Sequence, residues 1–222
     1  MYSFALLSLA SLSNFAHAQE TIDIGTLKNT EIKVVQKILY IKSGKSEYGG
    51  HFGLMPFDAY TITPKIDLTY GQHLSEVLMW EAGIGLGYGI KNGTFSELEG
   101  PSYGITPDAY RYLSSVHACA QYSPIYAKMT WDGSRIFHHD MYVLAGGVLA
   151  IEQAFMEDGT LSVAPGVSIG LGARIFLPNG NIIRLQLRDD ILFQGRAKTA
   201  AVQGFYLKQN TSISVGYTLL RK

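Results

Sequence analysis

Apolar and polar residues alternate over a long stretch between residues 163 and 191. From Val163 to Leu177 the odd-numbered positions are apolar, whereas glycine, serine or arginine fills the even-numbered positions from 166 to 174. Because successive side chains of a strand point to opposite faces, this pattern predicts a β-strand with one apolar face. Pro178–Asn181 predicts a tight turn, since Asn-Gly tolerates positive φ. After the turn, one parity carries Ile183, Leu185, Leu187 and Ile191, and the other carries Arg184, Gln186, Arg188 and Asp190.

Two kinds of protein contain such a hairpin. In a soluble β-sandwich the apolar face is buried in the core and the charged face meets water. In a transmembrane β-barrel the apolar face meets lipid and the charged face lines the interior. Soluble strands are usually about five or six residues long, whereas membrane-crossing strands need roughly nine to eleven. Both strands of this hairpin are of the longer kind, which favours the barrel.

Similar alternation recurs along the chain. It predicts eight long strands, at residues 47–55, 61–70, 77–90, 122–131, 140–151, 162–177, 182–193 and 211–220. Short turns alternate with longer loops, which are expected at residues 91–120 (with a short helix at 109–116), 152–160 and 194–208. This asymmetry is typical of outer-membrane barrels. The sequence therefore predicts an all-β protein, an eight-stranded antiparallel transmembrane β-barrel whose narrow interior is filled by side chains.

Aromatic residues near the strand ends are expected to form girdles at the membrane interfaces. The alternative is that they are ordinary core aromatics. The candidates are Tyr70, Tyr88, Tyr122, Trp131, Tyr142, Phe193 and Tyr217.

The N-terminus predicts a secretory signal peptide over residues 1–18. Phe4 to Leu12 is a short apolar run, and Ala16-His17-Ala18 is a cleavage site of the A-x-A kind, although no Lys or Arg precedes the apolar run. A buried amphipathic helix is the alternative. Residues 19–45 then form a periplasmic lead-in, with a short strand or helix near Glu31–Ile41, and residues 46–222 form the barrel domain.

Glycines occupy every second position from Gly83 to Gly89. A dinucleotide-binding fingerprint has a different spacing and lies between a strand and a helix. In a narrow barrel, glycines on one face leave room for long side chains that point inward from neighbouring strands. We therefore expect a packing role for them and no nucleotide.

The overall composition excludes some classes of function. The 18 Lys and Arg residues balance the 18 Asp and Glu residues, so no basic surface for nucleic acid is expected. Cys119 is the only cysteine and cannot form an internal disulfide. An inert buried thiol is the expected state for it, in preference to a nucleophile.

Charged residues on the polar parity are the main candidate site. They have both signs, and unpaired charges in a narrow interior are costly, so we expect them to pair. A structural ion-pair network that plugs the barrel is the favoured interpretation, and a gated, ion-selective path is the alternative. The predicted interior network comprises Lys65, Asp67, Glu81, Lys128, Arg174, Arg184, Arg188 and Asp190.

Three other groups contain residue types that could carry chemistry. His138-His139-Asp140 contains metal-ligand types, but adjacent residues of a strand point in opposite directions. His117 lies near Ser114 and Ser115, as a hydrolase would need, but without a recognisable signature. The acidic segment 152–158 lacks the ligand spacing of a calcium loop. We therefore expect no metal, no cofactor and no catalytic residue.

Several short motifs recur in a known group of proteins. They are Val34-Val35-Gln36-Lys37, Tyr122–Lys128, Leu144-Ala145-Gly146-Gly147 and the hairpin Gly170–Asp190. With these motifs the chain resembles the outer membrane beta-barrel domain proteins of myxobacteria and their relatives, from about Glu31 to Leu220. The resemblance implies a small outer-membrane barrel and no established enzymatic activity. The C-terminal Leu219-Leu220-Arg221-Lys222 departs from the terminal aromatic residue of many such barrels.

The sequence thus predicts a non-enzymatic β-barrel that reaches the outer membrane after Sec export. It would act as a structural anchor or recognise ligands through its surface loops. A narrow channel for small solutes, a lipid-active hydrolase and a soluble lipocalin-like barrel are the alternatives. The expected partners are outer-membrane lipid, lipopolysaccharide and the barrel assembly machinery. We expect a monomer that does not bind nucleic acid.

Overall fold

The computed structural model describes residues 41–131, 135–156, 159–196 and 204–222. The chain divides into two units, residues 1–37 and residues 38–222. The predicted signal peptide and nearly all of the predicted lead-in, including all but the last residue of the strand or helix near Glu31–Ile41, lie outside the described residues. Only the last residues of the lead-in, Ile41–Lys45, are described.

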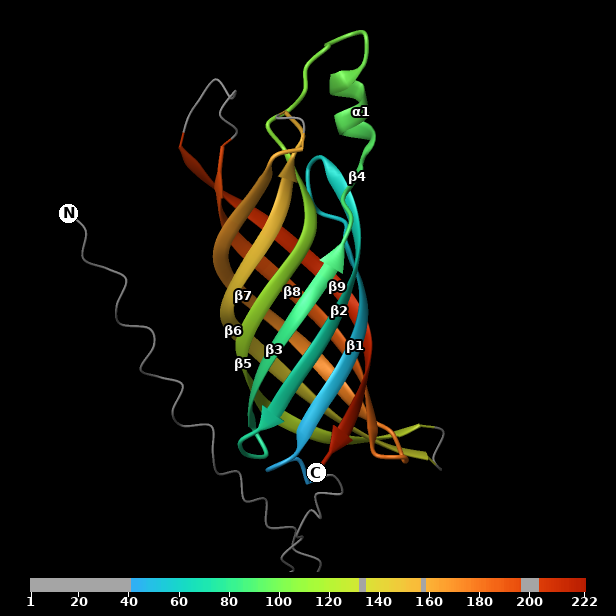
Figure 1. Cartoon of the computed structure of the whole chain (residues 1–222). Coiled ribbons are helices and arrows are strands. Elements are labelled where there is room, and N and C mark those ends of the chain that lie inside the picture. Colours follow the sequence, from blue (N-terminus) through green and yellow to red (C-terminus); the bar gives the residue numbers. More distant parts are fainter. Residues whose placement is uncertain (1–40, 132–134, 157–158, 197–203) are drawn as a thin grey trace, which may run out of the picture. The chain divides into compact units, whose positions relative to one another are not determined.

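The second unit is an antiparallel β-sheet that closes on itself (Figure 1). Each long strand pairs with the next long strand along the chain, and β1 also pairs with β9, which closes the ring. The long strands are β1 Ser46–Met55, β2 Thr61–His73, β3 Leu78–Gly87, β5 Tyr110–Trp131, β6 Arg135–Ala154, β7 Leu161–Phe176, β8 Asn181–Gly195 and β9 Phe205–Arg221.

The described residues contain nine strands, one more than the eight predicted. The additional strand, β4 Ile90–Lys91, has two residues and pairs only with the start of β2. It leads into α1 Gly93–Glu99, whose N-terminus is capped by the Asn92 side chain. Phe95 of α1 is fully buried and packs against Phe155. In the described part of the chain, no helix has the length and apolar character to cross a membrane.

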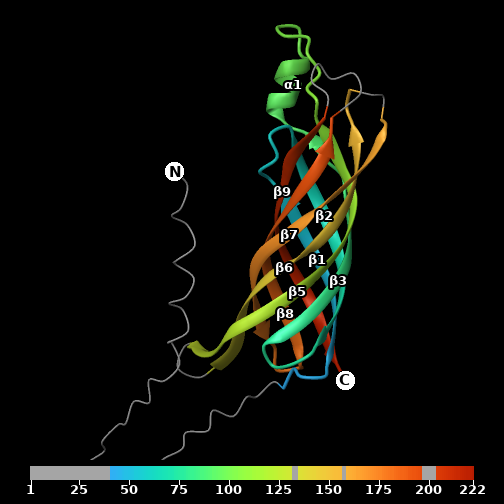
Figure 2. The ribbon, with the colours of Figure 1, turned by 90° about the vertical axis from the view of Figure 1, so that its left-hand side faces the viewer.

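All three loop predictions were wrong for parts of their ranges, because strands extend into them. Residues 152–154 belong to β6, residues 194–195 to β8 and residues 205–208 to β9. Residues 110–120 belong to β5, not to a loop, and the predicted helix at 109–116 is absent, since α1 lies earlier. Residues 135–139, which were not part of any predicted strand, form the start of β6. In β5 a register shift between Tyr112 and Ser114 interrupts the alternation, which hides the strand from a period-two pattern. The C-terminal end of β5 and the N-terminal end of β6 form a hairpin that extends beyond the barrel wall (Figure 2).

The burial pattern is the reverse of that of a soluble protein. Arg184 and Arg188 are 0% and 3% exposed, whereas Leu185 and Leu187, which alternate with them, are 49% and 39% exposed. The outward parity is apolar on strand after strand, and the inward parity is polar. The charged face of the hairpin formed by β7 and β8 therefore lines the interior, and its apolar face forms the outer wall.

The inward glycines make room for large neighbours, as their spacing predicted. A Cβ at Gly83 would lie 2.7 Å from the His117 ring, and one at Gly85 would lie 2.6 Å from Asp67 Oδ1. A Cβ at Gly172 would overlap the ring of Tyr142. Tyr142 was predicted to belong to an aromatic girdle, and this prediction was wrong, because its side chain is 2% exposed inside the barrel.

Candidate functional site: the barrel interior

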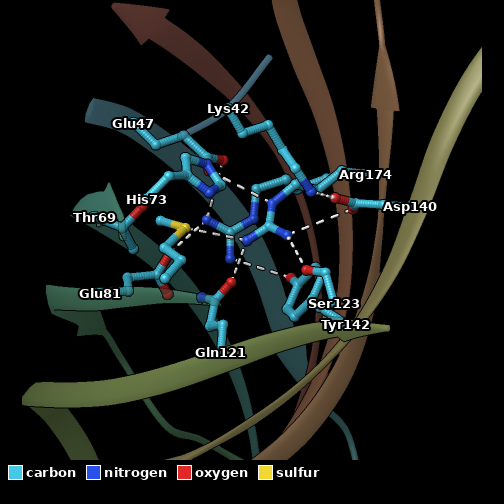
Figure 3. A network of polar contacts seen from close by, with 12 residues as sticks. Lys42, Glu47, Thr69, His73, Glu81, Gln121, Ser123, Asp140, Tyr142 and Arg174 are labelled. Atoms are coloured by element: carbon cyan, nitrogen blue, oxygen red, sulfur yellow. Dashed lines mark hydrogen bonds and ion pairs between the residues drawn. The ribbon is translucent and has the colours of Figure 1, made fainter. Parts of the chain in front are cut away.

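Arg174, on β7, lies at the centre of a polar cluster (Figure 3). It is two residues from the end of β7, close to the short turn that leads into β8. Its guanidinium stacks on the Tyr142 ring, 4.2 Å from the ring centroid. Nη1 donates to Ser123 Oγ at 3.1 Å, and Nη2 donates to Gln121 Oε1. The side chain is fully buried, so contacts from several strands replace its hydration shell.

Two carboxylates connect Arg174 with the strand ends. Glu47 Oε2 lies 3.5 Å from Arg174 Nε and 3.0 Å from His73 Nε2. Asp140 Oδ1 lies 3.5 Å from Arg174 Nη1, and its Oδ2 lies 2.5 Å from Lys42 Nζ. Lys42 precedes β1 in the chain, so its ammonium group reaches into the barrel from the short-turn end.

Arg184, on β8, forms the middle of the network. Nη1 pairs with Glu81 and lies 3.6 Å from Glu47 Oε1. Nη2 donates to Tyr142 Oη and to Gln186 Oε1, each at 3.1 Å. The guanidinium thus joins β8 to β1, β3 and β6 across the interior.

Arg188 lies four residues further along β8. Its Nε lies 3.2 Å from Asp190 Oδ1, and its Nη2 lies 3.6 Å from Asp67 Oδ1. Asp67 also lies 3.0 Å from Lys65 Nζ, and Ser168 donates to Asp190. This cluster fills the barrel on the side of Arg184 toward the long loops.

A lysine closes the network toward the long loops. Lys208 Nζ lies 2.9 Å from Glu152 Oε1 and donates to the Tyr110 carbonyl oxygen at 2.9 Å. Asn210 also donates to Glu152, at 2.9 Å. An external pocket of ≈ 230 Å³ lies above these groups, lined by Phe57, Asp58, Ala59, Tyr60, Asp108, Ala109, Tyr110, Tyr206, Leu207, Lys208 and Gln209.

Cationic and anionic side chains are paired along the interior of the described barrel. Each of six cationic side chains contacts a different carboxylate. The pairs are Lys42–Asp140 (2.5 Å), Lys65–Asp67 (3.0 Å), Arg174–Glu47 (3.5 Å), Arg184–Glu81, Arg188–Asp190 (3.2 Å) and Lys208–Glu152 (2.9 Å). The described lining therefore carries no ring of one charge sign of the kind that selects ions in a channel.

Most of the predicted interior network lies within these clusters. Seven of its members are buried in the interior, namely Lys65, Asp67, Glu81, Arg174, Arg184, Arg188 and Asp190. The prediction was wrong for Lys128, which is not buried and lies in the part of β5 that extends beyond the wall. Lys128 shares the parity of Tyr122, which points outward, so the register shift between Tyr122 and Ile125 does not account for its exposure.

Sequence reasoning missed several contributors, chiefly Lys42, Glu47, Asp140, Glu152 and Lys208. Glu47 could have been found, because it stands on the parity opposite Tyr48 and Phe52, which point outward. The others stand near strand ends, beside register shifts or outside strands, where alternation gives little information about direction.

Neither the hydrolase group around His117 nor the group His138-His139-Asp140 has the geometry that its chemistry needs. Arg188 Nη1 lies 3.1 Å from His117 Nε2, and Ser115 Oγ lies 2.8 Å from the Tyr112 hydroxyl, so this histidine faces a cation and not a serine. In the other group, His138 Nδ1 lies 2.8 Å from the Tyr126 hydroxyl, while Asp140 contacts Lys42 and Arg174. Within the described residues no cluster could hold a metal ion.

Comparison with known proteins gives structural similarities only. No protein-family model matches the chain, and no curated protein matches it. The N-terminal β-barrel domain of Pseudomonas aeruginosa OprF is 10% identical with a TM-score of 0.47, over 80% of this chain and 98% of that domain. Neisserial surface protein A is 10% identical with a TM-score of 0.41, over 79% and 95% of the two chains. Ail, the attachment invasion locus protein of Yersinia pestis, is 12% identical with a TM-score of 0.38, over 80% and 99%.

At these identities and TM-scores, none of the three proteins decides the function of this chain. The resemblance to the myxobacterial group is not tested by them either. The function must therefore be inferred from the chain's own side chains.

Proposed function

We propose that this protein is a non-enzymatic outer-membrane β-barrel whose eight long strands cross the bilayer and whose interior is closed by ion pairs. The observation that carries the proposal is the reversed burial of alternating residues. Apolar side chains on an outer wall would be unfavourable in water, whereas in a bilayer they meet acyl chains. If the two faces were exchanged, the charged side chains would have to face lipid, at a cost of several kcal/mol each.

A ring of outward aromatics supports the membrane assignment. Tyr48, Tyr70 and Trp80 follow one another on β1, β2 and β3, with ring centroids 5.1 and 5.5 Å apart. Tyr122 and Tyr217 continue the ring on β5 and β9, and all five are partly exposed. We call these five residues the lower girdle. Aromatic girdles of this kind mark the interface between lipid and water.

We place the long-loop end outside the cell. The short turns, the end of β9 and the start of β1 lie together at the other end, which would face the periplasm after Sec export. Lipid and lipopolysaccharide would surround the wall, and the barrel assembly machinery would insert it. Recognition of ligands would fall to the external loops and to the aromatic-lined pocket above Lys208.

Cell fractionation combined with gel migration tests the membrane assignment. The protein should sediment with the outer membrane and resist carbonate extraction. Its unboiled form should migrate differently from its boiled form, because a folded barrel resists detergent. Release by carbonate without detergent would instead indicate a soluble lipocalin-like barrel.

Electrical recording distinguishes an interior closed by ion pairs from a narrow channel for small solutes. Folded protein in a planar bilayer should produce no conductance steps, because six matched ion pairs fill the interior. A porin added afterwards to the same bilayer controls for the sensitivity of the recording. Reproducible steps from heat-modifiable protein would favour the narrow channel over the anchor.

A further inference from the structure

Arg111, at the start of β5, is a cation at the long-loop end that lacks an acidic partner among the described residues. Its neighbours at this end each contact a carboxylate. The pairs are Lys91–Glu99 (2.8 Å), Arg196–Asp108 (3.4 Å) and Lys208–Glu152 (2.9 Å). The Arg111 side chain is partly buried, and its Nε has no hydrogen-bond acceptor. This guanidinium therefore keeps a positive charge that an external anion could neutralise.

The guanidinium of Arg111 lies over aromatic rings on the outer side of the barrel. Its central carbon is 4.4 Å from the ring centroid of Tyr88, which is 52% exposed, and 4.9 Å from that of Phe155. Nη1 donates to the Tyr88 hydroxyl, whereas Nη2 donates to no described residue. Stacked rings cover the face of a guanidinium and leave its edge, which carries the N–H groups, for an acceptor such as phosphate.

A second cation shares these rings. Lys91 Nζ lies 5.6 Å from the ring centroid of Phe155. Its partner Glu99 is exposed, so water screens this ion pair. We call Arg111 and Lys91, together with the rings of Tyr88 and Phe155, the cationic platform. Its two cations face one carboxylate, so the platform has an excess of positive charge.

The cationic platform lies at the depth of the outer-leaflet headgroups. Tyr88, directly after β3, is eight residues from Trp80 of the lower girdle, and Arg111 is eleven residues from Tyr122 along β5. At about 3.4 Å per residue and a tilt of about 40°, these separations are about 20 Å and about 25–30 Å along the membrane normal. Because the apolar band of such barrels is about 25 Å tall, the platform lies at its upper boundary.

We propose that the cationic platform binds a phosphate group of lipopolysaccharide in the outer leaflet. The phosphate accepts hydrogen bonds from Arg111 Nη2, Lys91 adds its charge, and the acyl chains of the lipid lie against the apolar wall below. Free phosphate has the same oxygen acceptors but no acyl chains to hold it at this depth. The inference rests on the proposed function, because it requires the wall to lie in a bilayer with its long loops outside.

Binding of labelled lipid A to protein purified from outer membranes in detergent tests this site. The protein should bind phosphorylated lipid A at least tenfold more tightly than the same lipid after phosphatase treatment. Arg111→Gln should reduce this preference to less than about threefold, while the barrel still shifts on boiling. Arg196→Gln is the matched control, because Arg196 also lies over a tyrosine ring at this end but is paired with Asp108. It should keep the full preference.

Inorganic phosphate separates the two sources of the anion. In excess it should leave lipid A bound, because it lacks the acyl chains that contact the wall. Displacement of lipid A by inorganic phosphate would overturn the lipid assignment. Equal affinity for the two lipids in heat-modifiable protein, or an unchanged preference in Arg111→Gln, would overturn the phosphate site alone. Protein that does not fractionate with the outer membrane would overturn the proposed function instead.

Discussion

Replacing Arg184 with methionine should lower the free energy of unfolding by about 3–5 kcal/mol. The variant removes the cation that pairs with Glu81 and leaves that carboxylate, which is 2% exposed, without its partner. Glu47 is less affected, because it keeps its contacts with Arg174 and His73. Urea unfolding of the protein in lipid vesicles, followed by tryptophan fluorescence, measures the change.

Two companion variants separate the lost ion pair from a general effect of losing an arginine. Arg221→Met removes an exposed guanidinium at the end of β9 and should change the free energy of unfolding by less than about 0.5 kcal/mol. Adding Glu81→Gln to Arg184→Met removes the unpaired charge, and most of the lost stability should return. If Arg184→Met alone cost less than about 1 kcal/mol, water would have to hydrate Glu81, and the interior would not be a dry plug.

The division of the chain into inner and outer faces could be predicted from sequence because a membrane barrel has a simple rule. Its outer wall must be apolar at every second position, and its narrow interior accepts polar groups only if they are paired. The hairpin around Arg174, Arg184 and Arg188 follows this rule over most of its length, which is why the sequence places these residues correctly in the interior.

The rule failed where a register shift interrupts a strand. In β5 the shift near Tyr112 places neighbouring residues out of phase, so the start of this strand was hidden in a predicted loop. Such shifts depend on the pairing of β5 with β6 and leave no periodic signal in either strand alone. Lys128 was misplaced for another reason, since β5 runs on beyond the barrel wall there.

The pairing partners themselves could not be predicted. Arg184 and Glu81 are 103 residues apart in the chain and meet only because the stagger between strands brings β8 and β3 together across the interior. Arg111 is a further case, because its position falls in a predicted loop. Its contacts with the Tyr88 and Phe155 rings become visible only once β5 and its pairing with β6 are known.

Two adjacent glycines of β6 provide the sharpest test of which face is inside. A Cβ at Gly146 would overlap the Ala118 carbonyl oxygen and lie 2.5 Å from Cys119 Cα, whereas a Cβ at Gly147 would have nothing within 4 Å. Gly146→Val should therefore lower the free energy of unfolding by about 3 kcal/mol, because a strand backbone cannot move aside as a flexible side chain can.

Gly147→Val adds the same side chain one position later, on the outer wall. It should be neutral or stabilise the barrel by up to about 1 kcal/mol, because a β-branched residue favours a strand and would meet lipid. Urea midpoints in vesicles and the gel shift on boiling measure both variants. Since the two substitutions are chemically identical and their positions are adjacent, their difference reports only the direction of the side chain. Damage from Gly147→Val with tolerance of Gly146→Val would reverse the two faces, and the membrane assignment would fail with them.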